Sequence, residues 1–307
     1  MKKNKIISIS ALLLAAMIWG VAFVAQDKAS ETLGAFTINA SRSLIAAFVL
    51  APVALIIRKT QGKRYFEANK KDRCTLLKAG LFCGVFLCIS VNLQQFAISM
   101  YPEGAAVSGR AGFITALYII FVPIFGLFLG KKPGPVIILS VVLATVGLYF
   151  LCLSNGISAV YTGDIVMTLC GMSFAVQILT VDHFIDRVDP VKLSSLQFLV
   201  CGILSTILML IFEGFDYEAL WKNILPIIYL AVLSSSVGYT LQIVGQKYSD
   251  SPAVSSILMS MESVFAALGG ALLAGEQLKG REIIGCVIMF AAIILAQMPK
   301  KTKHEGH

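Results

Sequence analysis

The sequence predicts an all-α polytopic membrane protein with ten transmembrane helices arranged as two inverted five-helix repeats. Three observations lead to this fold class. Hydrophobic residues make up 57% of the 307 residues and charged residues only 14%, and the mean hydropathy is +0.84. Apolar stretches long enough to cross a bilayer recur along the whole chain. The second half also repeats residues of the first half at a nearly constant spacing.

Hydropathy places the ten predicted helices in chain order. They cover residues 6–25, 35–57, 76–99, 104–129, 134–153, 164–184, 191–212, 224–246, 252–275 and 281–298. Little sequence is left for a soluble domain. We therefore expect two domains, residues 1–157 and residues 158–307, each of them one five-helix repeat.

The placement of the basic residues predicts the membrane topology. The net charge is +8, from 25 Lys and Arg against 17 Asp and Glu. If the N-terminus is cytoplasmic, nineteen of these 25 basic residues lie in inside segments and four in outside loops, while Arg42 and Arg110 lie within spans. This asymmetry follows the positive-inside rule, so the charge indicates topology rather than a nucleic-acid partner. We expect a multi-pass protein of the cytoplasmic membrane with both termini in the cytoplasm.

The first hydrophobic stretch resembles a signal peptide but is expected to remain as a helix. Cleavage after Ala25 would put the bulky Phe23 at the −3 position, where small residues are required. Trp19, Phe23 and Gln26 share one face at the end of this helix. Trp19 is either a pocket residue or a member of the aromatic belt at the membrane interface. In the second helix, Arg42 either snorkels to the surface or serves the protein interior.

The third helix carries polar residues on one face. Cys88, Asn92, Gln95 and Ser99 follow one another at steps of four, three and four. Such a face either lines a water-accessible cavity or bonds one helix to another. The cavity is the favoured interpretation.

The fourth helix combines close-packing residues with a charge. Gly104, Ser108 and Gly112 form a ladder of small residues that favours tight helix packing. Arg110 points to the opposite side, where facing lipid is costly, so it is expected to face a cavity or a partner carboxylate. Pro123 is expected to kink the same helix.

The second half repeats several of these residues in order. At an offset of 151, Phe23 and Gln26 recur as Phe174 and Gln177. At an offset of 147, the polar face of the third helix recurs on the eighth, as Ser235, Tyr239, Gln242 and Gln246. Five spans in each repeat is an odd number, so the two copies enter the membrane in opposite orientations.

The ninth helix, residues 252–275, contains a single charged residue, Glu262. One side of this helix is small or hydroxylated and the other is bulky, with the carboxylate on the border. A charge at this depth costs roughly 2.5–3.5 kcal/mol, so it faces protein or water. Glu262 either pins the helix through a neighbouring hydroxyl or arginine, or serves as a substrate or proton site.

Other residue types argue against catalysis. The seven Cys lack C-x-x-C spacing and are expected to be buried thiols. The three His stand near a helix end or in the C-terminal tail. We therefore expect no catalytic residue, no metal site and no cofactor. An intramembrane enzyme or a lipid-handling membrane protein is the alternative class.

Three stretches resemble EamA-type transporters of the drug/metabolite transporter superfamily. They are WGVAF at residues 19–23, YTLQIVGQKY at 239–248, and AVSSILMSMESVF at 253–265, the last followed by Gly275-Glu276. The family usually has Glu-Pro where this chain has Glu262-Ser263, and Gly-Glu where it has Gly130-Lys131. The resemblance covers essentially the whole chain. It implies a secondary transporter, often an exporter of amino acids or other small metabolites, with a cavity between the repeats.

The residues themselves agree with this class, since they combine two pseudo-symmetric halves with intramembrane polar groups. The candidate cavity residues are Trp19, Phe23, Asn92, Gln95, Ser108, Arg110, Phe174, Gln177, Tyr239, Gln242 and Glu262. Their neutral hydrogen-bonding groups and aromatic rings suit a neutral, zwitterionic or drug-like small molecule. Two pseudo-symmetric halves suit transport by alternating access, and export is the direction that the resemblance implies. The expected partners are this substrate and membrane lipids, with the protein acting as a monomer. No particular coupling ion is indicated.

Overall fold

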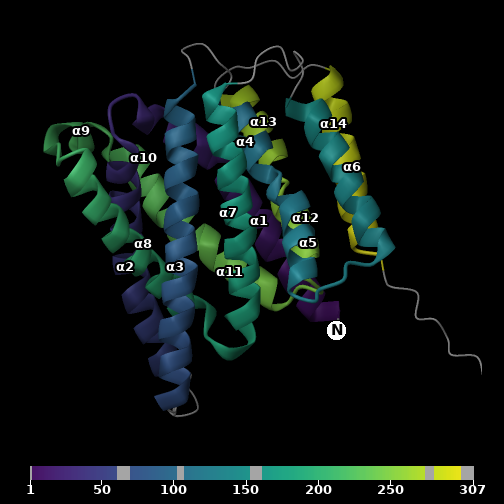
Figure 1. Cartoon of the computed structure of the whole chain (residues 1–307), viewed down its shortest axis with the longest axis horizontal. Coiled ribbons are helices and arrows are strands. Elements are labelled where there is room, and N and C mark those ends of the chain that lie inside the picture. The colour runs from purple at the N-terminus through teal and green to yellow at the C-terminus, as the bar shows by residue number, and fades with distance from the viewer. Residues whose placement is uncertain (1, 61–69, 102–106, 153–160, 274–279, 299–307) are drawn as a thin grey trace, which may run out of the picture.

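The computed structural model describes residues 2–60, 70–101, 107–152, 161–273 and 280–298, and all regular elements in these ranges are helices (Figure 1). The long helices run side by side in one bundle. The helices of the first half are α1 (Lys2–Ser30), α2 (Ala35–Thr60), α3 (Lys70–Ser99), α4 (Val107–Ala116), α5 (Tyr118–Phe128) and α6 (Pro135–Cys152).

The second half contains more interruptions. Its elements are α7 (Thr162–Phe184), the 3₁₀ turn η2 (Ile185–Arg187), α8 (Pro190–Phe212), α9 (Tyr217–Lys222), α10 (Ile224–Ile228), the π-helix η3 (Tyr229–Gly238), α11 (Tyr239–Lys247), α12 (Pro252–Met259), α13 (Glu262–Leu273) and α14 (Gly280–Ala296). Two of the helices start with a side-chain cap followed by proline. Asp189 accepts a hydrogen bond from the Lys192 amide before α8 (3.0 Å), and Ser251 accepts one from the Val254 amide before α12 (3.3 Å).

Eight helical segments of the described residues are long and apolar enough to cross a membrane. They correspond to the predicted spans other than the fifth and the tenth. Those two spans appear as shorter apolar helices, Pro135–Phe150 and Ile283–Ala296. Length and composition thus support a multi-pass membrane protein, while the count of ten spans stays a prediction.

Helices of the two halves pack against each other in corresponding pairs. α2 lies along α8, and α6 lies along α14 at one edge of the bundle, where Figure 1 shows the pair standing apart from the rest. α3 packs on α7 and α8, and α1 passes through the centre against α13, η3 and α11. This is the pairing that a pseudo-two-fold arrangement of repeats produces. Lys5 Nζ donates to the Gln297 carbonyl (2.5 Å), so both described ends lie on the same side of the bundle.

The predicted fourth and ninth spans are each broken into two helices. Leu117 separates α4 from α5, and its amide donates to the Ile114 carbonyl three residues back (3.2 Å). The break between α12 and α13 is similar, because the Met261 amide donates to the Leu258 carbonyl (3.3 Å). Such short-range bonds tighten the backbone and interrupt the regular helical ladder. The break at Leu117 was not predicted from the sequence, and Pro123, where a kink was expected, lies inside α5.

Two ion pairs hold α7 to the first half. Near its start, Arg110 of α4 binds Asp164. Near its end, Lys131 binds Asp182. The segment from α4 to Lys131, just after α5, is therefore fixed to α7 near both of its ends.

The outer surface of the bundle is apolar. Phe48, Phe128 and Leu225 are 81%, 85% and 76% exposed. Exposed apolar side chains of this size indicate a surface that faces lipid rather than water. Polar side chains within spans, such as Arg42, Gln95 and Glu262, are instead buried in the bundle.

Candidate functional site

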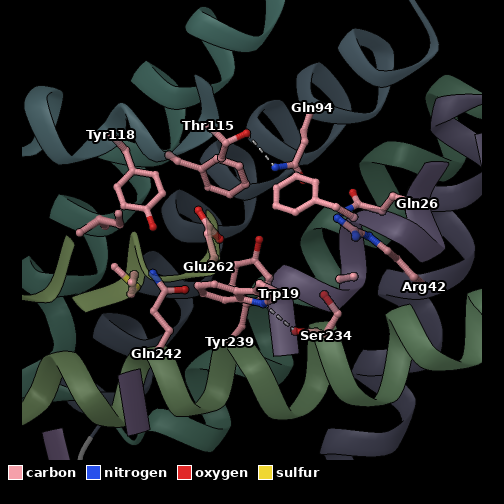
Figure 2. Close-up of a pocket in the computed structure, with 15 residues that line it drawn as sticks. Trp19, Gln26, Arg42, Gln94, Thr115, Tyr118, Ser234, Tyr239, Gln242 and Glu262 are labelled. Carbon is pink, nitrogen blue, oxygen red and sulfur yellow. Dashed lines mark hydrogen bonds between the residues drawn. The ribbon is translucent and has the colours of Figure 1, made fainter. Parts of the chain in front are cut away.

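A narrow cavity of about 40 Å³ lies at the centre of the bundle (Figure 2). Helices of both halves enclose it. Its lining residues are Trp19, Ala22, Phe23, Gln26, Arg42, Gln94, Thr115, Tyr118, Phe174, Ile178, Ser234, Tyr239, Gln242, Met259 and Glu262.

The two broken helices each contribute their first residue after the break. Tyr118 begins α5 and Glu262 begins α13. Both side chains are buried, and Figure 2 shows the Tyr118 hydroxyl on the side of the Glu262 carboxylate. The two groups lie near enough to interact, and neither Tyr118 Oη nor Glu262 Oε1 has another hydrogen-bond partner among the described residues. Interrupted helices at membrane depth are tolerated where they line a cavity, and here they place two polar groups in it.

Arg42 supplies the positive charge of the cavity. It lies on α2 and is 2% exposed, while Glu262 is 4% exposed. Figure 2 shows Arg42 and Gln26 on one side of the view, with Glu262 and Tyr118 on the other. Neither Arg42 nor Glu262 belongs to an ion pair within the described ranges. Burying an unpaired charge is costly, so two such groups around one cavity are unusual for a purely structural core.

An aromatic wall closes one side of the cavity. The rings of Trp19 and Tyr239 lie 4.9 Å apart at 58°, and Phe198 packs edge-on against Tyr239 at 5.2 Å. Trp19 Nε1 donates to the Ser234 carbonyl (3.1 Å). Ser234 belongs to the π-helix η3, a form that is frequent at functional sites. Trp19 is therefore held by both a hydrogen bond and a ring contact.

Side-chain amides complete the lining. Gln242 Nε2 donates to Gln177 Oε1 (3.2 Å), and Gln94 Nε2 donates to Thr115 Oγ1 (3.3 Å). The Oε1 atoms of Gln242 and Gln26 accept no hydrogen bond from the described residues. Free acceptors, a carboxylate, a guanidinium and aromatic rings together can recognise a small molecule that is partly polar and partly apolar.

The cavity volume limits what fits in the conformation described. About 40 Å³ holds roughly three water molecules, at about 10–15 Å³ for each. A metabolite is larger, so the lining side chains must move apart to admit one.

Six of the predicted cavity residues line the cavity: Trp19, Phe23, Phe174, Tyr239, Gln242 and Glu262. Gln177 is one step removed, since it accepts the hydrogen bond of Gln242. The side chain of Ser108 lies outside the described residues. The other three predicted residues bond elsewhere.

Asn92 and Gln95 connect helices instead of facing the cavity. Asn92 Nδ2 donates to Ser205 Oγ (3.0 Å), and Asn92 Oδ1 accepts from Asn39 Nδ2 (3.0 Å). Gln95 Nε2 donates to the Gln26 carbonyl (3.2 Å). On α3 the lining residue is Gln94. The polar face of this helix thus serves packing in the structure, the alternative to the cavity that the sequence favoured.

Arg110 has a partner carboxylate, which was one of the two arrangements expected for it. Its Nε and Nη2 donate to Oδ1 and Oδ2 of Asp164 at 2.6 and 2.5 Å. Tyr101 Oη donates to the same carboxylate (2.9 Å), and the guanidinium lies 4.6 Å from the centre of the Tyr161 ring. This cluster is distinct from the cavity lining.

The structure adds lining residues that were not among the candidates. These are Ala22, Gln26, Arg42, Gln94, Thr115, Tyr118, Ile178, Ser234 and Met259. Two of them had a signal in the sequence: Gln26 shares a helix face with Phe23, and Arg42 is a charge within a span. No residue pattern marked Tyr118, because its place depends on the break at Leu117.

A bundle of membrane-length apolar helices around a buried polar cavity, lined by both halves of the chain, defines a multi-pass membrane transporter. The sequence identifies which kind. The chain belongs to the EamA-like transporter family, whose model matches residues 6–153 and 161–298. The resemblance to this family of the drug/metabolite transporter superfamily is thereby confirmed.

Relatives of this chain carry transporter names. A protein of Archaeoglobus fulgidus named "uncharacterized transporter" is 26% identical over 288 residues, which are 94% of this chain and 84% of the relative. The threonine/homoserine exporter RhtA of Salmonella typhimurium is 32% identical over 228 residues, which are 73% of this chain and 70% of RhtA. One protein with a crystal structure shares the fold, with a TM-score of 0.74 at 16% identity over 94% of this chain and 96% of the other.

Proposed function

We propose that this protein is a secondary transporter that exports a small neutral or zwitterionic metabolite, such as an amino acid, or a drug-like compound. It does so across the cytoplasmic membrane by alternating access. The observation that carries the proposal is the cavity itself, which both halves line and to which each broken helix contributes a polar residue, Tyr118 or Glu262. Discontinuous helices at a repeat interface are a recurring construction of substrate sites in secondary transporters. The name of RhtA supports export of an amino acid.

The proposal includes a topology. α6 and α14 cross the membrane with the eight longer segments, which gives two inverted repeats, residues 1–157 and 158–307, within one functional monomer. Both termini are cytoplasmic. Cysteines introduced at Lys28 and Ser158 should react with an impermeant thiol reagent from outside, and those at Lys63 and His304 only after permeabilisation. Reaction at 158 and 304 from the same side would overturn the topology.

Catalysis fits the cavity less well than transport. Intramembrane hydrolysis needs converging acids, a nucleophile with its base, or metal ligands. Glu262 is the single carboxylate among the lining residues, and the lining contains neither histidine nor cysteine. We therefore propose that the protein is not an enzyme.

A lipid-handling function is the second candidate, and one observation favours it. A hollow of about 390 Å³ lies between α5 and α6, lined by apolar residues such as Ile124, Leu127 and Val141, with Lys132 among them. A hollow of this kind can receive an acyl chain. It opens on the bundle surface, however, and lacks the polar groups of the central cavity, so we assign it no part in transport.

Exchange measurements test the proposal. Proteoliposomes loaded with unlabelled L-threonine should accumulate labelled L-threonine faster than unloaded ones, because a carrier exchanges substrate and a channel does not. Gln242→Trp, which fills the cavity, should abolish the exchange. Leu233→Trp is the matched control, since Leu233 belongs to the preceding element, η3, and is 42% exposed. Absence of stimulated exchange for every metabolite in a broad panel would overturn the proposal.

A further inference from the structure

We infer that Arg42 and Glu262 together form a binding site for zwitterions: Arg42 binds the carboxylate of the substrate and Glu262 binds its ammonium group. The inference rests on the proposed transport function. It narrows the substrate class to small molecules that carry both charges close together, as α-amino acids do. Neither residue alone defines this class, because each would accept a simple anion or cation.

The first support is the burial of both charges without an ion-pair partner among the described residues. Arg42 is 2% and Glu262 4% exposed, and Arg42 Nε and Glu262 Oε1 have no hydrogen-bond partner among the described residues. Two other intramembrane charges of the bundle differ in this respect, since Arg110 and Asp164 pair with each other. Buried charges are normally paired, so the two unpaired ones have capacity for a ligand.

The second support is that both residues line the same cavity from different helices. Arg42 comes from α2 of the first half and Glu262 from α13 of the second. Figure 2 shows them on different sides of the view, apart from each other. A zwitterion between them would pair both charges at once. A cation would leave the guanidinium unpaired, and an anion would leave the carboxylate unpaired, which makes both of these poorer ligands.

The chemistry of each group matches its assigned role. A guanidinium presents a planar fork of donors that fits a carboxylate with two parallel hydrogen bonds. A carboxylate accepts only, which suits an ammonium group with its three donors. Beside Glu262, the hydroxyl of Tyr118 lies within the lining, and the unpaired Oε1 atom of Gln242 provides a further acceptor. These neutral groups can complete the ammonium site without adding charge.

The test compares ligands that lack one charge at a time. A panel of L-amino acids including threonine and homoserine is screened by thermal shift on the purified protein. The best ligand is then compared with its methyl ester, which lacks the carboxylate, and its N-acetyl derivative, which lacks the ammonium group. Wild-type protein should bind the amino acid at least about 30-fold more tightly than either derivative, the usual loss when one partner of a desolvated charge pair is removed.

Two variants then test which residue recognises which charged group of the ligand. Arg42→Gln should lose the preference for the free acid over the methyl ester and keep the preference over the N-acetyl derivative. Glu262→Gln should show the converse. The matched control is the double variant Arg110→Gln with Asp164→Asn, which removes a charge pair away from the cavity and should keep both preferences. Arg42→Lys and Glu262→Asp preserve the charges and serve if a neutral variant fails to fold, with both preferences retained at lower affinity.

The outcomes separate this inference from the function on which it rests. If labelled substrate exchanges but wild-type protein binds a derivative as tightly as the amino acid, the inference fails and the transporter stands. If no metabolite exchanges, the proposed function fails. A Glu262→Gln protein that keeps its preference for the free amine while its transport loses pH dependence would place Glu262 in proton coupling instead. If neither neutral variant changes a preference, Arg42 and Glu262 do not bind the charged groups of the ligand, and the inference fails.

Discussion

Arg110 of α4 and Asp164 of α7 form a two-pronged ion pair, with Nε to Oδ1 at 2.6 Å and Nη2 to Oδ2 at 2.5 Å. The pair joins the two segments that match the family model, residues 6–153 and 161–298. Its side chains are only 19% and 12% exposed. A pair with this geometry and burial holds the two halves of the chain together at one end of α7.

Neutralising one member of this pair should destabilise the protein. Arg110→Gln or Asp164→Asn leaves the other charge without its main partner, which costs about 3 kcal/mol. We expect each variant to melt well below wild type in detergent, and the double variant to recover part of the loss. Melting monitored by size-exclusion chromatography measures this.

An exposed ion pair provides the control for that experiment. Lys222 and Glu218 are paired on α9 with side chains 68% and 79% exposed. Pairs of this kind contribute little, so Lys222→Gln should melt like wild type. Equal melting of Arg110→Gln and Lys222→Gln would contradict a structural role for the Arg110–Asp164 pair.

Replacement of Gly20 by alanine should push α1 away from α13. A Cβ atom at this position would lie 2.6 Å from Phe265 Cβ and 2.7 Å from both the Glu262 carbonyl oxygen and the Ala266 amide nitrogen. These atoms are backbone or Cβ and cannot rotate away, so we expect a loss of about 1–3 kcal/mol, typical of overpacking. Gly134→Ala is the control, because no atom lies within 4 Å of a Cβ there. The prediction fails if the two alanine variants have the same melting temperature.

Tryptophan fluorescence should report ligand binding directly. The chain has two Trp: Trp19 lines the cavity and Trp221 is 63% exposed. In a Trp221→Phe protein, saturating substrate should change the emission intensity or wavelength, since it contacts the remaining indole. A Trp19→Phe protein should show no change with the same ligand. A ligand-dependent signal that survives Trp19→Phe would place the binding site elsewhere.

Neighbouring glutamines on α3 should differ in their protection by substrate. Gln94 lines the cavity, whereas Gln95 donates to the Gln26 carbonyl between helices. With the native cysteines replaced, Gln94→Cys should react with a small hydrophilic thiol reagent and be protected by substrate. Gln95→Cys should react slowly and without protection. The reverse pattern would show that the face of α3 with Gln95 lines the cavity, as the sequence predicted.

The positions of the helices were largely predictable, because hydropathy and charge asymmetry depend on composition over a whole helix. The breaks within helices were not. Leu117, Ser260 and Met261 are ordinary residues of helical segments, and the proline expected to kink the fourth span, Pro123, lies inside α5. The interruptions depend on how the helices pack in the bundle, which no local sequence pattern contains.

The candidate site was predictable in part for a similar reason. Glu262 could be found because it is the one charge of its span. Arg42 and Arg110 are chemically alike, and what separates them is a partner 54 positions away in the sequence, Asp164. Gln94 and Gln95 differ by about 100° around the helix axis. Choosing between them requires the direction of the bundle centre.

The spacing of the two ion pairs of α7 also matches the thickness of a lipid bilayer. Asp164 and Asp182 lie about 27 Å apart along the helix, at 1.5 Å per residue, and the residues between them carry no charge. The hydrocarbon layer of a bilayer is about 30 Å thick. Each ion pair can then sit close to one headgroup region, and a thicker bilayer would draw at least one of them among the acyl chains. The transport rate in reconstituted vesicles should therefore be highest at one acyl-chain length. That length should not depend on the headgroup type.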